Sequence, residues 1–217
     1  MNAASTLLTN QLITEFVKPY VSEGWMESAR AIEMADLVRA VQPDTIVEVG
    51  VFGGRSLIAQ ALALKEIGKG KIYGIDSWKK EDALEGEQKA NRDWWEHNVD
   101  LHSIHRGLME SIWRLGLDDY VVIIRASSHR VPKLFPGGIQ ILNLDGNHSE
   151  AASLRDAKLY VPQLNTNGYV WIDDMDWQDE SGHNTTKKAV DYITSECVKV
   201  RVSADGHYGL FCRKSGS

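Results

Sequence analysis

The 217-residue chain has only two cysteines and five prolines, and it has no long hydrophobic run. Cys197 and Cys212 cannot build the disulfide framework of a small secreted domain, so we expect two reduced thiols in a cytoplasmic protein. No stretch of about 20 apolar residues is present, which excludes a membrane span. The N-terminus also lacks the pattern of a secretory leader. We therefore expect no membrane partner.

Basic residues are outnumbered as well, with 24 Lys and Arg against 30 Asp and Glu and a formal net charge of -6. A field of this sign repels phosphate backbones, and no local basic patch offsets it, so we expect no nucleic-acid partner. Hydrophobic residues make up 43% and charged residues 25%, which are ordinary globular values. The length predicts one domain over residues 1–217.

Short runs rich in β-branched residues alternate with segments of helical periodicity, a pattern typical of parallel βαβ units. The fold class is therefore α/β, with a doubly wound, mostly parallel seven-stranded sheet and one antiparallel C-terminal strand. A helical segment at 1–42 precedes the sheet, and a helical cap is inserted at 78–118. The predicted strands are 45–50, 71–76, 120–126, 139–145, 169–173, 198–202 and 208–213, and the predicted helices are 26–41, 55–67, a mostly polar stretch at 81–115, 127–134, 150–164 and 185–197.

The first predicted strand ends in a glycine-rich turn, with Glu48, Gly50, Phe52, Gly54 and Ser56 in its sequence. In such sheets ligands bind beyond the carboxyl ends of the strands, and glycine lets the backbone approach them. A dinucleotide site would need a glycine where the bulky Phe52 stands. The charge of Glu48 favours a cationic group, which suits a sulfonium and an amino-acid ammonium. The alternative is a tight turn with no ligand.

The second and third predicted strands end in polar residues suited to a nucleoside. Asp76 stands where a carboxylate accepts hydrogen bonds from both hydroxyls of a ribose. Ser77 and Trp78 follow it, and Trp78 is placed to pack on adenine. Ser127, after the third strand, is positioned for the adenine edge. The alternative for Asp76 is a helix cap, and Ser127 and Ser128 are equally good caps of the next helix, a role compatible with the adenine contact.

Three carboxylates stand at the ends of the fourth and fifth predicted strands: Asp145, Asp173 and Asp174. Unpaired carboxylates at one rim repel one another, and a divalent cation with oxygen ligands, Mg²⁺ rather than Zn²⁺, resolves that repulsion. The alternative is that some of them cap a helix or pair with Arg155 or Lys187.

His148 lies three residues beyond Asp145 and is the candidate general base, since imidazole titrates near neutrality. His183, in a loop after the fifth strand, is a candidate substrate contact, and the alternative is a histidine on a surface loop. Asp176 and Asp179 do not lie at strand ends, so we expect them to be solvated.

Tryptophan is concentrated in the predicted cap, where Trp78, Trp94, Trp95 and Trp113 account for four of the seven in the chain. Trp94 and Trp95 offer flat apolar surface for the wall of an acceptor pocket, as in sites that bind rings or sugars. The alternative is that these side chains form the small core of the cap itself.

Together these residues resemble the class I S-adenosylmethionine-dependent methyltransferases. The resemblance extends from about Arg30 to Arg213, and it is specific to the metal-dependent O-methyltransferases, which include catechol O-methyltransferase and the bacterial macrocin O-methyltransferase and cephalosporin-hydroxylase-like enzymes. The glycine turn resembles the methionine-binding motif, Asp76 the ribose carboxylate and Ser127 the adenine-side residue. The segment from Leu144 to Glu150, followed by Asp156, Pro162, Gly168, Asp173 and Asp174, is the most specific match. Catechol O-methyltransferase has Asn at the place of Asp174 and Lys at the place of His148, so the metal site here is more acidic.

The resemblance implies a Mg²⁺-dependent O-methyltransferase. A hydroxyl of a small sugar, polyketide or phenol attacks the methyl carbon of S-adenosylmethionine, Asp145 and His148 act catalytically, and Asp145 also borders the cofactor. Two alternatives are a nicotinamide-dependent oxidoreductase on the same fold and a non-catalytic partner subunit that binds S-adenosylmethionine. A homodimer is left open.

Overall fold

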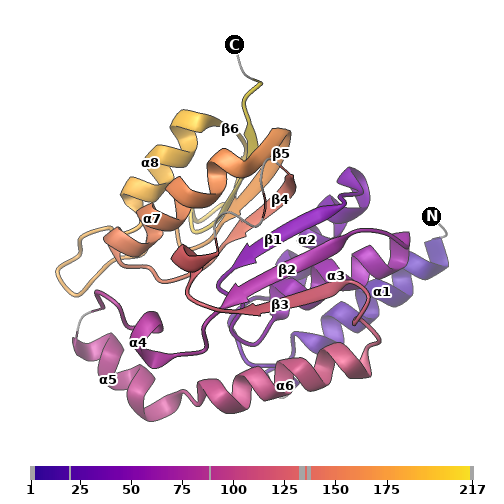
Figure 1. Cartoon of the computed structure of the whole chain (residues 1–217), viewed down its shortest axis with the longest axis horizontal. Helices are drawn as coiled ribbons and strands as arrows, with labels where there is room; N and C mark the ends of the chain where they lie inside the picture. The colour runs from indigo at the N-terminus through magenta and orange to yellow at the C-terminus, as the bar shows by residue number, and fades with distance from the viewer. Residues whose placement is uncertain (1–2, 20, 88, 132–134, 136–137, 216–217) are drawn as a thin grey trace.

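Seven strands form a single sheet in the computed structural model, which describes residues 3–19, 21–87, 89–131, 135 and 138–215. The strand order is β3-β2-β1-β4-β5-β7-β6 (Figure 1). Strands β1 to β5 are parallel, and β7 runs antiparallel to both β5 and β6. The predicted fold class is therefore confirmed. The strands are β1 (Thr45–Val49), β2 (Lys71–Asp76), β3 (Val121–Arg125), β4 (Ile139–Leu144), β5 (Leu164–Ile172), β6 (Cys197–Val202) and β7 (Gly209–Arg213).

The central strands are apolar on both faces because helices cover both. Ile46 of β1 and Ile141 of β4 join the core on one side of the sheet, and Val47 and Leu142, one residue further along, join the core on the other. This alternation follows the pleat of a strand. The first core is covered by α1 (Ala3–Phe16), α2 (Ser28–Val41) and α3 (Arg55–Ile67), and the second by α7 (Glu150–Tyr160) and α8 (Lys187–Glu196).

The predicted cap is three helices: α4 (Lys80–Ala83), α5 (Lys89–Asn98) and α6 (Leu101–Arg114). Asp100 caps α6 by accepting hydrogen bonds from the backbone N–H groups of residues 102 and 103. Helix α6 buries Leu108 and Ile112 in the same core as α3. Helices α4 and α5 lie beyond the arrowheads of β1, β2 and β3, on the side where the site is expected (Figure 1).

Three predicted elements differ from the structure. The helix expected over 127–134 is only a 3-10 turn at Ser128–Arg130, and residues 132–134 lie outside the described part of the chain. Pro132 accounts for the early end, because a proline disfavours the helical conformation at the residue before it. Strand β5 begins at Leu164 rather than at 169, so it takes in the last residue of a helix predicted over 150–164. None of the helices in the described residues is long and apolar enough to cross a bilayer.

Candidate active site

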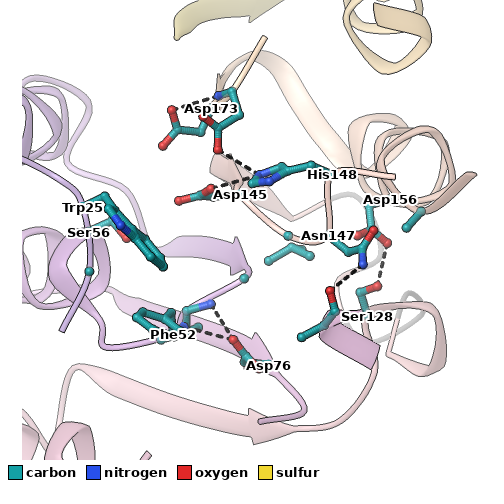
Figure 2. A pocket seen from close by; sticks show the side chains of 18 of the residues that line it. Trp25, Phe52, Ser56, Asp76, Ser128, Asp145, Asn147, His148, Asp156 and Asp173 are labelled. Carbon is teal, nitrogen blue, oxygen red and sulfur yellow. Dashed lines mark hydrogen bonds and ion pairs between the residues drawn. The ribbon is translucent and has the colours of Figure 1, made fainter. Parts of the chain in front are cut away.

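A cavity of about 830 Å³ opens beyond the carboxyl ends of β1, β2, β4 and β5. Residues from α4, α5 and the segment 23–27 before α2 also line it. Figure 2 shows the two ends of this cavity, with Asp76 and Phe52 at one and Asp145, His148 and Asp173 at the other. The strand-end residues predicted from the sequence are thus mostly brought together.

The glycine turn between β1 and α3 makes two close backbone approaches. A side chain at Gly50 would place its Cβ 1.9 Å from the carbonyl oxygen of Asp145, and one at Gly53 would place it 2.2 Å from that of Glu23. Glycine is therefore required at both positions. The turn is fixed against the β4 loop on one side and the segment before α2 on the other.

Asp76 accepts hydrogen bonds from the backbone N–H groups that surround it. Its Oδ2 accepts from Val51 and Phe52, both at 3.0 Å, and its Oδ1 accepts from Trp78 at 2.7 Å. These bonds hold Phe52 and Trp78 at φ values of 50° and 48°, which L residues rarely adopt. A carboxylate has about four acceptor positions, so roughly one is left for a ligand hydroxyl, where two were expected.

Glu48 is not on the cavity wall, contrary to its prediction as a cofactor contact. Its side chain is fully buried below the turn, where its Oε1 accepts from Ser56 Oγ at 2.7 Å and its Oε2 from Gln60 Nε2 at 3.0 Å. Burial raises the pKa of Glu48 to about 8. The carboxyl is therefore mostly neutral near pH 7, and it supplies little charge to attract a sulfonium.

Trp78 also differs from its prediction, because it lies outside the cavity lining. Its indole is buried, its Nε1 donates to the Phe52 carbonyl at 3.0 Å, and its ring centroid lies 4.5 Å from that of His105. The Trp78 side chain therefore stabilises the glycine turn from outside the cavity. The neighbouring Ser77 does line the cavity.

A third part of the cavity lining, next to the end of β3, consists of hydroxyls that are bonded to carboxylates. Ser127 Oγ donates to Asp82 Oδ2 at 2.7 Å, and Ser128 Oγ donates to Asp156 Oδ1 at 2.6 Å (Figure 2). Asn147 Nδ2 donates to the carbonyl oxygens of residues 82, 83 and 85, which ties α4 to the loop after β4. Asp82 was not predicted, since nothing in the cap sequence marks it as facing the sheet.

The acidic rim brings Asp145, His148 and Asp174 together, with one ligand atom from each lying within 4.8 Å of the others. His148 Nε2 lies 3.0 Å from Asp174 Oδ2 and 3.7 Å from Asp145 Oδ1. This nitrogen is buried and makes no hydrogen bond of good geometry to any described residue. Asp174 is held at φ 50°, an unfavourable conformation of the kind found at functional sites.

Burial and neighbouring charges shift the pKa values of the rim residues. Burial, and then the charge of Asp173, raises the pKa of Asp145 well above its usual value. Burial opposes the protonation of His148, but the neighbouring carboxylates of Asp145 and Asp174 outweigh it and raise the pKa of His148 to about 9. The cluster therefore retains a proton near pH 7. A divalent ion bound there could supply positive charge in place of that proton. The donor set of two carboxylates and an imidazole fits such an ion.

Asp173 is paired with a cation, though not with the Arg155 or Lys187 that we considered. Arg30 Nη1 of α2 donates to its Oδ2 at 2.6 Å, and its Oδ1 accepts from the Asp174 backbone N–H at 2.9 Å. Both oxygens are thus engaged, which makes Asp173 a poorer metal ligand than expected. Arg155 instead bonds Glu85, and Lys187 bonds Asp191.

His207 completes the rim and was not predicted. It lies in the loop between β6 and β7, where its Nε2 is 2.6 Å from Asp174 Oδ1 and its Nδ1 is 2.8 Å from Asp176 Oδ1. Asp176 therefore has a partner, contrary to the expectation of a purely solvated side chain. Asp173, Asp174 and His207 form a second group with metal-ligand spacing.

Four aromatic rings from three segments form a cluster that borders the cavity, which we call the aromatic wall: Trp25, Phe52, Trp94 and Trp95. Trp25 stacks on Phe52 with ring centroids 5.1 Å apart, and it lies 6.3 Å from both Trp94 and Trp95. All four line the cavity. Trp94 and Trp95 thus line the cavity, whereas Trp113, 77% exposed, lies outside the lining.

His183 does not reach this cavity. It lines a smaller hollow of about 290 Å³ beside Trp177, and its Nε2 lies 3.3 Å from Glu150 Oε2. Its loop folds back on itself, since the Asp179 carboxylate accepts from the His183 backbone N–H. The predicted substrate contact is therefore not placed at the rim.

Comparison with known proteins identifies one family whose model, described as a methyltransferase domain, matches residues 47–175. Uncharacterized protein R132 of Acanthamoeba polyphaga mimivirus is 27% identical over 152 residues, which cover 70% of this chain and 60% of that protein. The match thus spans under two thirds of the relative's length.

Solved structures share the fold at low identity. The O-methyltransferase NovP is 17% identical with a TM-score of 0.73, covering 98% of this chain and 99% of that one. TomG, an O-methyltransferase from Streptomyces achromogenes solved in complex with SAM, is 14% identical with a TM-score of 0.63, covering 99% and 92%. The Podospora anserina methyltransferase PaMTH1, solved with SAH, is 12% identical with a TM-score of 0.64, covering 99% and 89%.

Proposed function

Because the chain belongs to the methyltransferase-domain family and is a class I S-adenosylmethionine-dependent methyltransferase, we propose that it methylates a hydroxyl oxygen of a small molecule with the help of a divalent cation. The observation that carries this proposal is the rim, where Asp145, His148 and Asp174 bring ligand atoms together in the lining of the cavity. The O-methyltransferase names of NovP and TomG agree with it.

The cavity supports the cofactor in an extended pose across the strand ends. Asp76 has an acceptor position for one ribose hydroxyl, and Ser127 and Asp82 offer donor and acceptor groups to an adenine. The glycine turn lines the cavity through Gly50 and Gly53 and would border the chain that carries the sulfonium. This pose leaves the methyl group directed toward the rim.

Asp145 and Asp174 are the carboxylates that would hold the cation, with His148 Nε2 as a third donor. When bound, a divalent cation lowers the pKa of a coordinated hydroxyl and fixes its position. Asp173 contributes indirectly, because its bond to Arg30 and to the Asp174 backbone orients the neighbouring carboxylate. His148 then has two possible roles, as a ligand or as the base that accepts the hydroxyl proton, and we assign it the role of ligand because its Nε2 faces the two carboxylates.

The acceptor occupies the space between the rim and the aromatic wall. Flat rings favour an acceptor with a flat or ring-shaped apolar surface, and a chelating cation favours two adjacent hydroxyls. A vicinal diol on a sugar, a polyketide or a phenol has both features.

Metal titration tests the rim directly. Wild-type protein is expected to bind Mg²⁺ or Mn²⁺ in calorimetry, and the variants Asp145→Asn and Asp174→Asn are expected to lose that binding. Asp179→Asn, in an exposed acidic loop, is the matched control. Full methyl transfer to a vicinal diol in excess EDTA would show that the metal has no part in the reaction.

Ligand binding separates the proposed enzyme from its alternatives. S-adenosylhomocysteine is expected to raise the melting temperature, and NAD is expected to leave it unchanged, since only a true ligand of the folded state stabilises it. Radiolabel transfer from S-adenosylmethionine to a panel of vicinal diols then distinguishes an active enzyme from a non-catalytic partner subunit.

A further inference from the structure

Arg30 of α2 lines the cavity, and part of its guanidinium has no hydrogen-bond partner among the described residues. Its Nη1 donates to Asp173 Oδ2 at 2.6 Å, and its guanidinium carbon lies 4.1 Å from the centroid of the Tyr208 ring. Its Nε and Nη2 are shielded from solvent and have no hydrogen-bond partner among the described residues. These two nitrogens share one edge of the guanidinium, and such an edge grips a carboxylate with two parallel N–H···O bonds.

The other arginines of the cavity lack such an edge. Arg55 donates through all three of its side-chain nitrogens to oxygens of Ser22 and Met26. Arg155 donates through both terminal nitrogens to the two oxygens of Glu85. Among the described arginines of the lining, Arg30 alone keeps a two-nitrogen edge for an anion.

Arg30 lies close to the rim, and therefore close to the proposed position of the cofactor's sulfur. Resting on the function proposed above, we propose that Arg30 binds the carboxylate at the amino-acid end of S-adenosylmethionine. The sulfur that carries the methyl group also carries the amino-acid chain, whose carboxylate is four bonds away. If the methyl group faces the rim, the carboxylate lies close to it as well. Arg30 contacts Asp173, which is adjacent in sequence to Asp174 of the rim.

The guanidinium is held ready for this contact. Asp173 fixes one nitrogen, the Tyr208 ring covers one face, and only 10% of the side chain is exposed. A charged edge that is kept from water and lacks a partner is an unfavourable state, and a bound carboxylate relieves it. The bond to Asp173 then has a second consequence, because it places a carboxylate within reach of the ligand's ammonium group.

Two ligands that differ only in the amino-acid portion test the proposal. Calorimetry measures the affinities of S-adenosylhomocysteine and of 5′-methylthioadenosine, which lacks the carboxylate and ammonium, for wild-type protein, Arg30→Met and Arg30→Lys. The control is Arg201→Met, which removes an exposed arginine paired with Glu33. No acceptor and no metal are needed.

Arg30→Met is expected to bind S-adenosylhomocysteine about 30-fold more weakly or worse, with the affinity for 5′-methylthioadenosine unchanged. Arg30→Lys keeps the positive charge but not the two parallel N–H donors, so its affinity for S-adenosylhomocysteine should fall by less than that of Arg30→Met. An equal loss for both ligands, or no loss for either, would overturn the proposal. Retained binding of 5′-methylthioadenosine shows that the variant is folded. If wild-type protein binds neither ligand, the proposed function itself fails, which is a different result.

Discussion

Replacement of the buried Glu48 with glutamine should change how stability depends on pH. Burial raises the pKa of Glu48 from 4.5 to about 8 in the folded protein. Between these values the folded state binds more protons than the unfolded state, so stability falls as the pH rises. With each pKa unit worth about 1.36 kcal/mol, Glu48 lowers the unfolding free energy by roughly 3 kcal/mol between pH 5.5 and 8.5.

Glutamine removes this titration and fits the same space. Its amide oxygen can accept from Ser56 Oγ, and its amide nitrogen can donate to Gln60 Oε1, which is buried and has no hydrogen-bond partner among the described residues. The second bond requires only that the Gln60 amide turn over. Glu48→Gln should therefore fold and should gain stability relative to wild type as the pH rises.

Urea unfolding of both proteins at pH 5.5, 7 and 8.5 measures the difference. It should grow by about 3 kcal/mol in favour of Glu48→Gln across this range. Glu66→Gln is the control: although burial opposes its ionisation, bonds from Thr6 and Arg39 hold the pKa of Glu66 below 4.5, so its difference from wild type should stay constant above pH 5.5. Parallel pH curves for Glu48→Gln and wild type would refute the reasoning, because they would mean that Glu48 is ionised in the fold.

Three further predictions follow from the site. His148→Ala should weaken Mn²⁺ binding about tenfold or more in calorimetry; unchanged metal affinity with a lowered kcat would instead make His148 the base. Asn147→Ala loses its bonds to three cap carbonyls, so urea unfolding should show a loss of about 1–3 kcal/mol, with faster amide exchange at residues 80–87; equal exchange would contradict the tie to α4. Trp94→Ala and Trp95→Ala should each raise the KM for the diol acceptor without changing that for S-adenosylmethionine, whereas Trp113→Ala should change neither.

The fold and most of the rim were predictable because their determinants are local. Runs such as 45–50 and 139–145 are short, β-branched and bounded by turns, and they became β1 and β4 with boundaries shifted by only a residue or so. Asp145 and Asp174 were found because parallel strands end at the same edge, so a carboxylate just after a strand has a known position.

The rest depends on tertiary packing. Arg30 and His207 come from a helix and a hairpin loop, and neither periodicity nor spacing tells which rim residue such a side chain will meet. Glu48 was misplaced because strand-end reasoning does not say on which face of the sheet a side chain lies. Trp25 stands between Gly24 and Met26 in a segment without periodicity, so no sequence pattern predicts that it stacks on Phe52.

The rim draws on parts of the chain that are synthesised at very different times. Arg30 belongs to one of the first helices and His207 to the last hairpin, and they meet Asp173 and Asp174 on either side of β5. The rim is therefore complete only when the last hairpin has paired with β5 and has brought His207 to Asp174.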